Sequence, residues 1–293
     1  MMKRFKNIGL LLHLDRNNDA AMQYAVDSAK HNDAQLYLIC ADKQQRSSTE
    51  QQQIKDVLDA KLSYKYRLIF LTGQPVIEIC QFVARQAIDL LIMEPDIKSG
   101  LKRFFFGSLT LSLLRKIACP IWVVKPQKAH MYQRILICVD PMAEEAEEKA
   151  LNHKLIQIGT ALAKRESAEC HLLCAWHLPG EDRLNGAFIS MPAAELEKLK
   201  TQQKVKVARA FEALQALNKT HLTDCQTHLH HGEPVSAVTE FVDHNKIDLV
   251  VMGTLARSGV QGFVMGNTAE AIINQLECSI MAIKVDGFVS PIP

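Results

Sequence analysis

The first 125 residues alternate between two patterns of hydrophobic and polar positions. Apolar runs of strand length occupy residues 6–15, 34–41, 64–71, 89–94 and 121–125. Between them, segments 19–30, 48–62, 75–86 and 108–117 repeat their apolar positions at helical spacing, and the third opens with a proline, which helix starts favour. Strands that alternate with helices in this way predict a parallel sheet covered by helices.

The second half of the chain repeats this order. At an offset of 159, twelve residues of segment 73–125 recur unchanged in segment 232–284, including Gly107 as Gly266 and Lys125 as Lys284. Near the start of each half, matching positions such as Asp15 and Asp140 are only 125 residues apart. The second half has therefore gained 34 residues between its first strand and its third helix. We attribute them mostly to a longer first helix and to segment 178–192. The repeat predicts two domains, 1–127 and 128–293, each an α/β sandwich with a five-stranded parallel sheet.

Composition narrows the class of protein. The chain has 293 residues, of which 48% are hydrophobic and 23% charged, and its net charge is only +2. These values suit two globular domains and give no electrostatic argument for a nucleic-acid partner. The eight cysteines include no Cys-x-x-Cys pair, and we interpret them as small buried residues in a reducing compartment. No run approaches the ~20 apolar residues of a membrane span, and the short run 8–12 lacks a cleavage site, so we expect a cytoplasmic protein.

Segment 247–284 carries the candidate chemistry. An apolar run ends at Gly253, a loop follows with further glycines, and a helical pattern begins at Asn267. A glycine loop that leads into a helix start gathers free backbone amides at the positive end of the helix dipole, which favours phosphate. Glycines also serve ordinary turns, so a plain turn remains the alternative.

The spacing of this loop points to a family. Gly253, Ala256 and Gly266 with Asn267 fall at Gly-x2-Gly-x9-Gly-Ser/Thr, which resembles the ATP-binding signature of the universal stress protein family, and the run from Gly266 to Glu270 resembles its tandem members. Ala256 stands where the family has a second glycine, and Asn267 where it has serine or threonine. Alanine in a loop that needs a positive φ costs about 1 kcal/mol, so we expect weaker or altered nucleotide binding.

The resemblance implies an adenine nucleotide α-hydrolase-like fold and ATP, or a related nucleotide, as ligand of the second domain, with magnesium only as the companion of the nucleotide. It implies that Asp140 contacts the adenine, that Cys138, Ala175 and Met252 wall the base pocket, that Gly253 lies near the ribose, and that Ala256, Gly266, Asn267 and Thr268 belong to the phosphate loop. These positions lie at the carboxyl ends of predicted strands, where open parallel sheets bind ligands. Two alternatives stay open: Asp140 caps the next helix, and Arg257 either meets a phosphate or is solvated.

The first half departs from this loop. Glu94, Ile97, Gly107 and Ser108 stand at the corresponding positions. The Glu94 carboxylate would meet a triphosphate as a like charge, at a cost of about 1 to 4 kcal/mol at ~4 Å. We therefore expect the first domain to have lost ATP binding. Phe104, Phe105 and Phe106 either plug the vacated cleft or line an apolar pocket.

Other chemistry is weaker. His228, His230 and His231 end a predicted strand. Either their imidazoles bind a transition metal, or they are simply exposed at the strand end. The spacing matches no known zinc motif, and we predict no metal site. The sequence contains no nucleophile elbow and no kinase motif. We therefore assign no catalytic residue and expect a protein that is not an enzyme, with slow ATP hydrolysis left open.

Three functions follow from the sequence. The first is a nucleotide-binding regulatory protein of the stress response. The second is a binder of an apolar or lipid-like ligand, motivated by Phe104 to Phe106 and by segment 178–192. The third is a scaffold for protein partners, in which the two halves form a pseudo-dimer and the last strands, 121–125 and 280–284, pair with each other. Monomer and homodimer both stay open.

Overall fold

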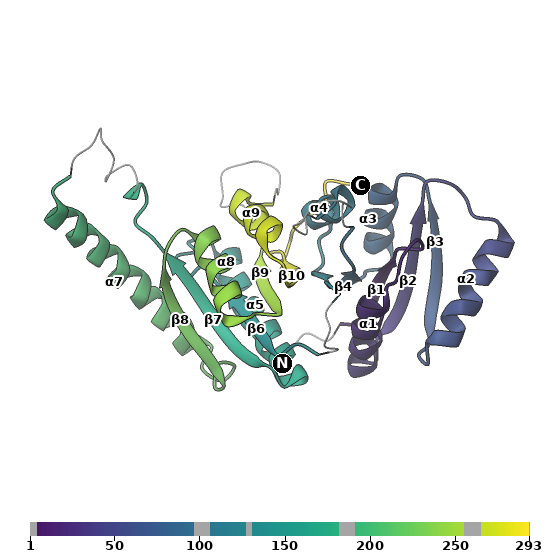
Figure 1. Cartoon of the computed structure of the whole chain (residues 1–293), viewed down its shortest axis with the longest axis horizontal. Helices are drawn as coiled ribbons and strands as arrows, with labels where there is room; N and C mark the ends of the chain where they lie inside the picture. The colour runs from purple at the N-terminus through teal and green to yellow at the C-terminus, as the bar shows by residue number, and fades with distance from the viewer. Residues whose placement is uncertain (1–4, 97–105, 127–130, 182–190, 255–264, 293) are drawn as a thin grey trace. The chain divides into compact units, whose positions relative to one another are not determined.

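The computed structural model describes residues 5–96, 106–126, 131–181, 191–254 and 265–292. The chain divides into two compact units (Figure 1). Unit 1 comprises Met1–His130, Thr254–Gly266 and Glu277–Pro293, and unit 2 comprises Met131–Gly253 and Asn267–Leu276. The last strand of the chain therefore belongs to the unit that holds the amino-terminal half.

The first half forms its nine predicted elements, each within three residues of the predicted ends. They are β1 (Asn7–Leu12), α1 (Asp19–Asn32), β2 (Gln35–Asp42), α2 (Ser48–Lys61), β3 (Tyr66–Thr72), α3 (Pro75–Arg85), β4 (Leu90–Met93), α4 (Ser108–Lys116) and β5 (Ile121–Val123). Helix α1 packs on β1, β2 and β4, and α3 lies beside α4. The predicted parallel α/β architecture is confirmed.

In unit 1 the strands lie in the order β3-β2-β1-β4-β5 and run parallel. The sixth strand, β10 (Ser279–Ile283), pairs antiparallel with β5, so that Ile280 lies opposite Val123 and Ala282 opposite Ile121. The predicted pairing of the two last strands is therefore confirmed. The prediction of five strands in each domain does not hold for the compact units. Strand β10 comes from the second repeat but pairs along the open edge of β5, and so it joins unit 1. Among the described residues, unit 1 holds six strands and unit 2 holds four.

Unit 2 has the strand order β9-β6-β7-β8, again all parallel. Its elements are β6 (Arg134–Cys138), α5 (Ala146–Glu166), β7 (Glu169–Trp176), α7 (Ala193–Leu217), β8 (Cys225–His231), α8 (Pro234–Asn245), β9 (Leu249–Gly253) and α9 (Asn267–Gln275). Helix α5 packs on β6, β7 and β9, and α8 lies beside α9. Parallel strands place their carboxyl ends at one edge of the sheet, where the predicted site residues lie.

The extra length of the second half is distributed differently from the prediction. Helix α7 has 25 residues against 14 in α2, whereas α5 has 21 against 14 in α1. The second helix therefore contributes more of the added residues than the first. Helix α7 is only sparsely buried: of its 25 residues, only Leu196, Val207, Phe211 and Leu214 are buried.

Candidate functional site

Three strands of unit 2 end close together at the carboxyl edge. Strand β6 lies between β9 and β7, with Ile137 opposite Val251 and Cys138 opposite Leu173. Cys138 and Ala175 are half-buried, whereas Met252 is almost fully buried. Neighbouring strand ends thus gather these three side chains, a thiol, a methyl and a thioether, in one part of the sheet edge.

Asp140 follows β6 and is held by its backbone. The Asn152 side chain on α5 donates to the Asp140 carbonyl oxygen at 2.7 Å and accepts from the Asp140 amide at 3.1 Å. The Asp140 carboxylate is exposed and accepts from the Met142 amide at 3.1 Å. Because α5 begins at Ala146 with Glu145 as its N-cap residue, Asp140 does not cap that helix, and the capping alternative is wrong. An exposed carboxylate on a fixed backbone can accept hydrogen bonds from a ligand.

Gly253 has a packing role in the structure. A side-chain carbon at this position would lie 2.8 Å from a methyl carbon of Leu151 on α5, a distance that real carbon contacts do not reach. Glycine therefore lets α5 approach the end of β9 closely. This packing explains the glycine without any ligand, and the proximity of Gly253 to a ribose stays a prediction.

Thr254 is a candidate site residue that the sequence reasoning missed. It is 1% exposed, and its hydroxyl oxygen has no hydrogen-bond partner among the described residues. Its amide donates to the Ile283 carbonyl at 3.1 Å, and its carbonyl accepts from the Gly266 amide at 3.1 Å. An unsatisfied buried hydroxyl is costly and rare. The only sequence signal was a polar residue directly after an apolar strand run.

Gly266 is buried and directly precedes α9, whose first two residues, Asn267 and Thr268, are exposed. Helix α9 begins where the sequence predicted, and it buries Ala269, Ile272 and Ile273. Polar side chains at the first turn and free amides are the groups that hold anions at helix starts. The loop residues Ala256, Arg257, Gly259 and Gly262 lie outside the described residues.

The corresponding helix start in unit 1 is occupied by the chain itself. The Asp96 carboxylate accepts from the amides of Leu109 at 3.1 Å and Thr110 at 2.8 Å, and also from the Thr110 hydroxyl. The Gly107 amide donates to the Asp96 carbonyl at 2.6 Å, and a side chain at Gly107 would collide with that oxygen. An internal anion therefore fills the positive end of α4.

Glu94 closes a second helix start in unit 1. It is 5% exposed, and its carboxylate accepts from the Ala21 amide in the first turn of α1 at 3.3 Å. Burial raises the pKa of this carboxyl, although bonds from the α1 amides and the charge of Arg16 act in the opposite direction. The imidazole of His13 lies 3.0 Å from the Glu94 carbonyl oxygen. These contacts fill the strand ends with the protein's own polar groups, which supports the prediction that the first half has lost its nucleotide site.

Phe106 is buried, and the Lys125 ammonium lies 4.8 Å from the centre of its ring, a cation–π contact. For this residue the plug interpretation therefore fits better than an open pocket. Ile97, Phe104 and Phe105 lie outside the described residues, as do Phe188 and Ile189 of segment 178–192.

The histidines are held by protein groups. The imidazoles of His171 and His228 lie 3.2 Å apart, and both rings contact Phe241 of α8. Burial lowers the pKa of both imidazoles. His231 faces the Glu181 carboxylate at 3.3 Å. Within the described ranges no three His, Cys, Asp or Glu side chains are placed to hold one metal ion.

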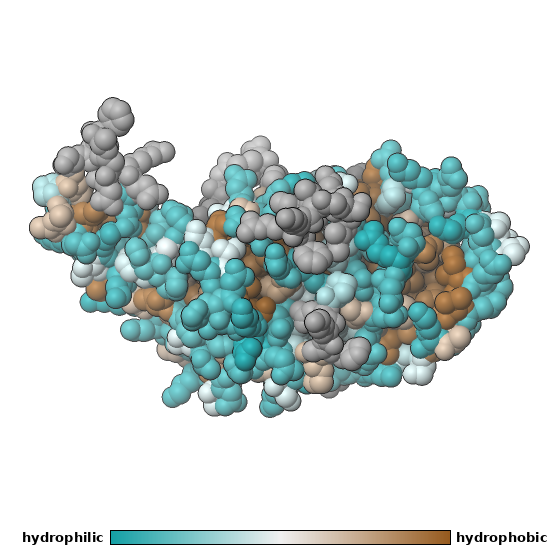
Figure 2. Space-filling view, viewed as in Figure 1, coloured by the Kyte–Doolittle hydropathy of each residue, from teal (hydrophilic) through white to brown (hydrophobic). Residues whose placement is uncertain are grey.

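Two surface hollows lie elsewhere. The first, of about 670 Å³, lies in unit 1 between α2 and β3. Its wall combines Tyr66, Leu68 and Phe70, from alternate positions of β3, with polar side chains of α2 that include Lys55 and Asp59. Figure 2 shows apolar residues gathered on the side of the view where these elements lie. Helix α2 buries only Leu58, so this helix leaves much of the β3 surface uncovered.

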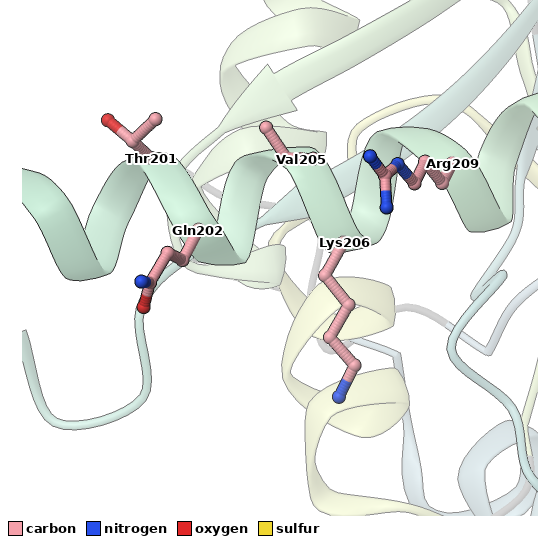
Figure 3. Close-up of a pocket in the computed structure, with 5 residues that line it drawn as sticks. All are labelled: Thr201, Gln202, Val205, Lys206 and Arg209. Carbon is pink, nitrogen blue, oxygen red and sulfur yellow. The ribbon is translucent and has the colours of Figure 1, made fainter.

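The second hollow runs along α7 and is lined by Thr201, Gln202, Val205, Lys206 and Arg209 (Figure 3). One helix supplies all five residues, so the hollow is walled from one side only. Such a depression is a poor ligand site, because ligand sites enclose most of their occupant.

None of the helices in the described parts of the chain combines the length and apolar character that a bilayer crossing requires.

Comparison with known proteins gives consistent matches over most of the chain. The family model described as Universal stress protein family matches residues 4–125 and again residues 131–284. Universal stress protein E of Photorhabdus laumondii is 30% identical over 251 residues, which are 85% of this chain and 77% of that protein. Universal stress protein E of Escherichia coli K12 is 28% identical over 249 residues, with the same two coverages.

Solved structures agree on the fold. A functionally unknown protein of Pseudomonas aeruginosa PAO1 superposes with a TM-score of 0.75 at 20% identity, covering 96% of this chain and 93% of that chain. A universal stress protein of Archaeoglobus fulgidus superposes with a TM-score of 0.64 at 16% identity, covering 95% and 98%. At these identities the likeness supports the architecture alone.

Proposed function

The chain belongs to the universal stress protein family as a tandem member, and from that premise we propose that it is a stress-response regulator whose second half binds ATP or a related nucleotide. In this proposal the start of α9 holds the phosphates, through Gly266, Asn267 and Thr268. The adenine lies against Cys138, Ala175 and Met252, and the Asp140 carboxylate accepts hydrogens of its amino group.

The observation that carries the proposal is the contrast between the two repeats. In the first, Asp96 and Thr110 close the start of α4 with an internal anion. At the offset of 159 their counterparts are Leu255 and Ala269, neither of which has a polar side chain. The second repeat therefore keeps the helix start and lacks the groups that neutralise it in the first.

A second observation supports the same location. The Thr254 hydroxyl is buried without a hydrogen-bond partner in the described part of the chain, and the Thr254 carbonyl binds the Gly266 amide. A ligand oxygen that accepts from this hydroxyl would remove the cost of leaving it unsatisfied. In the first half the corresponding residue is Pro95, which has no hydroxyl.

Calorimetric titration of nucleotide-stripped, full-length protein with ATP tests the proposal. We expect one site per chain, with loss of binding in Gly266→Asp because a carboxylate there repels phosphate. Asn267→Ala should weaken binding, whereas the matched variant of the first repeat, Ser108→Ala, should leave the affinity unchanged. No heat and no thermal shift up to millimolar ATP would overturn the proposal, and so would equal effects of the two alanine variants.

We further propose that the nucleotide acts as a signal rather than as a substrate, and that the protein passes this signal to a protein partner in the cytoplasm. Any hydrolysis of ATP would then be slow. We expect the unchanged protein to release phosphate from ATP no faster than the Gly266→Asp variant does. Turnover well above that rate, abolished by Gly266→Asp, would assign an enzyme instead.

The hollow between α2 and β3 favours a second candidate function, the binding of a small organic ligand that has both apolar and polar groups. Its volume of about 670 Å³ suits a small organic molecule. Leu68→Lys should then reduce uptake of an apolar fluorescent dye, whereas Val57→Lys on the exposed face of α2 should not. Equal dye uptake by both variants and the unchanged protein would remove this candidate.

A further inference from the structure

Two cysteines that are far apart in the sequence face each other in unit 2. The register of the parallel strands β7 and β8 places Cys170 directly opposite Cys225. Neighbouring strands lie about 4.8 Å apart, and disulfides join residues whose Cα atoms lie about 4.4 to 6.8 Å apart. Side chains at registered positions of parallel strands project from the same face of the sheet. The backbone therefore holds the two sulfurs within bonding reach without any rearrangement of the strands.

The two thiols also interact. The proximity of the two thiols lowers the pKa of Cys170 and raises that of Cys225. Cys170 is therefore the thiol of the pair that ionises more readily, and the thiolate is the nucleophilic form of cysteine. Both sulfurs are unbonded to any other cysteine in the structure.

The pair also has access to solvent. Cys170 is buried, but Cys225 is half-buried and begins β8, the edge strand of unit 2. An edge strand exposes one side of its backbone, so a small oxidant reaches the pair through Cys225.

We propose that Cys170 and Cys225 form a reversible disulfide when the protein meets hydrogen peroxide. One sulfur attacks the peroxide oxygen, so that an S–O bond forms, the O–O bond breaks and the first water leaves with the thiol proton. The second sulfur attacks the sulfenic acid, so that the S–S bond forms, the S–O bond breaks and the second water leaves. Two thiols and one peroxide thus give one disulfide and two waters.

This bond is also open to reduction, because Cys225 is half-buried and lies on the edge strand β8, and exposed disulfides are the labile ones. While it lasts, it ties the edge strand β8 to β7 and closes the chain segment that contains α7.

Cys174 provides an internal control. It lies on β7, four residues after Cys170, and the register places it opposite Leu229 rather than a cysteine. Burial, followed by the charge of Asp140, raises the pKa of the Cys174 thiol to about 12. The same strand therefore carries one paired and one unpaired thiol on the same face.

The test treats folded, full-length protein with hydrogen peroxide, blocks the remaining thiols and maps peptides by mass spectrometry. We expect a linked peptide pair that contains Cys170 and Cys225, a loss of two of the eight thiols, and reversal by dithiothreitol. The melting temperature should rise by roughly 5 °C or more on oxidation, because the bond restrains the unfolded chain. Cys225→Ser, at the half-buried position, should abolish both effects, whereas Cys174→Ser should retain them.

Three results would overturn the proposal. The first is oxidation of Cys170 or Cys225 to sulfinic acid without a linked peptide. The second is a linked peptide that joins either residue to a different cysteine. The third is an equal rise in melting temperature for Cys225→Ser and the unchanged protein.

Discussion

Lys284 is a buried cation that holds the end of a helix. Its ammonium donates to the carbonyl oxygens of Leu114 and Ile117, at the carboxyl end of α4, and lies 4.7 Å from the ring centre of Phe288. Carbonyl groups at a helix end lack partners within the helix and attract cations. Burial nevertheless lowers the pKa of Lys284 to about 8. Hydrogen bonds to these carbonyl groups therefore stabilise the charged form of Lys284, whereas the loss of hydration destabilises it.

The lowered pKa predicts how stability depends on pH. Between about pH 8 and the ordinary lysine value of 10.5, the unfolded chain binds more protons than the folded one, so the contribution of Lys284 to stability increases as pH rises. Compared with Lys284→Met, the unchanged protein should gain up to about 3 kcal/mol across this window. Denaturant unfolding of both proteins at several pH values measures the difference.

A difference between Lys284→Met and the unchanged protein that stays constant across this window would show that Lys284 is not the depressed group.

At the residue scale the sequence revealed residue types better than contacts. The sequence singled out Gly253 and Asp140 as site residues, but the packing of Leu151 on Gly253 and the clamp of Asn152 on Asp140 depend on where α5 lies. Thr254 was missed because an unsatisfied hydroxyl is a property of its surroundings. The role of every predicted nucleotide-site residue remains a prediction.

Helix α4 shows how a single carboxylate completes an element. Asp96 accepts three hydrogen bonds at the start of the helix, two from amides and one from the Thr110 hydroxyl. Asp96→Ala removes these acceptors and leaves the amides unsatisfied. We expect the free energy of unfolding to fall by about 1 to 3 kcal/mol, measured by denaturant titration. Ser108→Ala, at the exposed first residue of the same helix, should change it by less than about 0.5 kcal/mol.

An unchanged stability in Asp96→Ala would mean that water replaces the carboxylate without cost. The contrast with α9, on which the proposed nucleotide site rests, would then lose its energetic basis.

The elements themselves were predictable because their signals are local. Pro75 and Pro234 open α3 and α8 at the same position of each repeat, and the apolar stripe of α9 matches its buried residues. The partner of β10 followed from the family resemblance rather than from its own sequence. The register that opposes Cys170 to Cys225 could not be read, because it depends on how β8 lies against β7.

At the scale of the whole molecule, the chain returns to its first half at its end. Strand β10 pairs with β5, the Ser279 hydroxyl accepts from the Lys125 amide at 3.0 Å, and Lys284 binds the end of α4. Residues 277–293 therefore complete unit 1, although the sequence repeat assigns them to the second domain.

This arrangement predicts the behaviour of a fragment. Residues 1–126 alone would leave β5 as an unpaired edge of only three residues, flanked by the apolar side chains that β10 covers. Exposed edges of this kind recruit other strands. We expect the fragment to self-associate and to melt at a lower temperature than the same fragment joined through a flexible linker to residues 277–293. Light scattering after size exclusion, and thermal unfolding, measure the two effects. If both fragments are monomeric and have the same melting temperature, β10 does not stabilise unit 1. The boundary between the repeats is then also the boundary between independently stable domains.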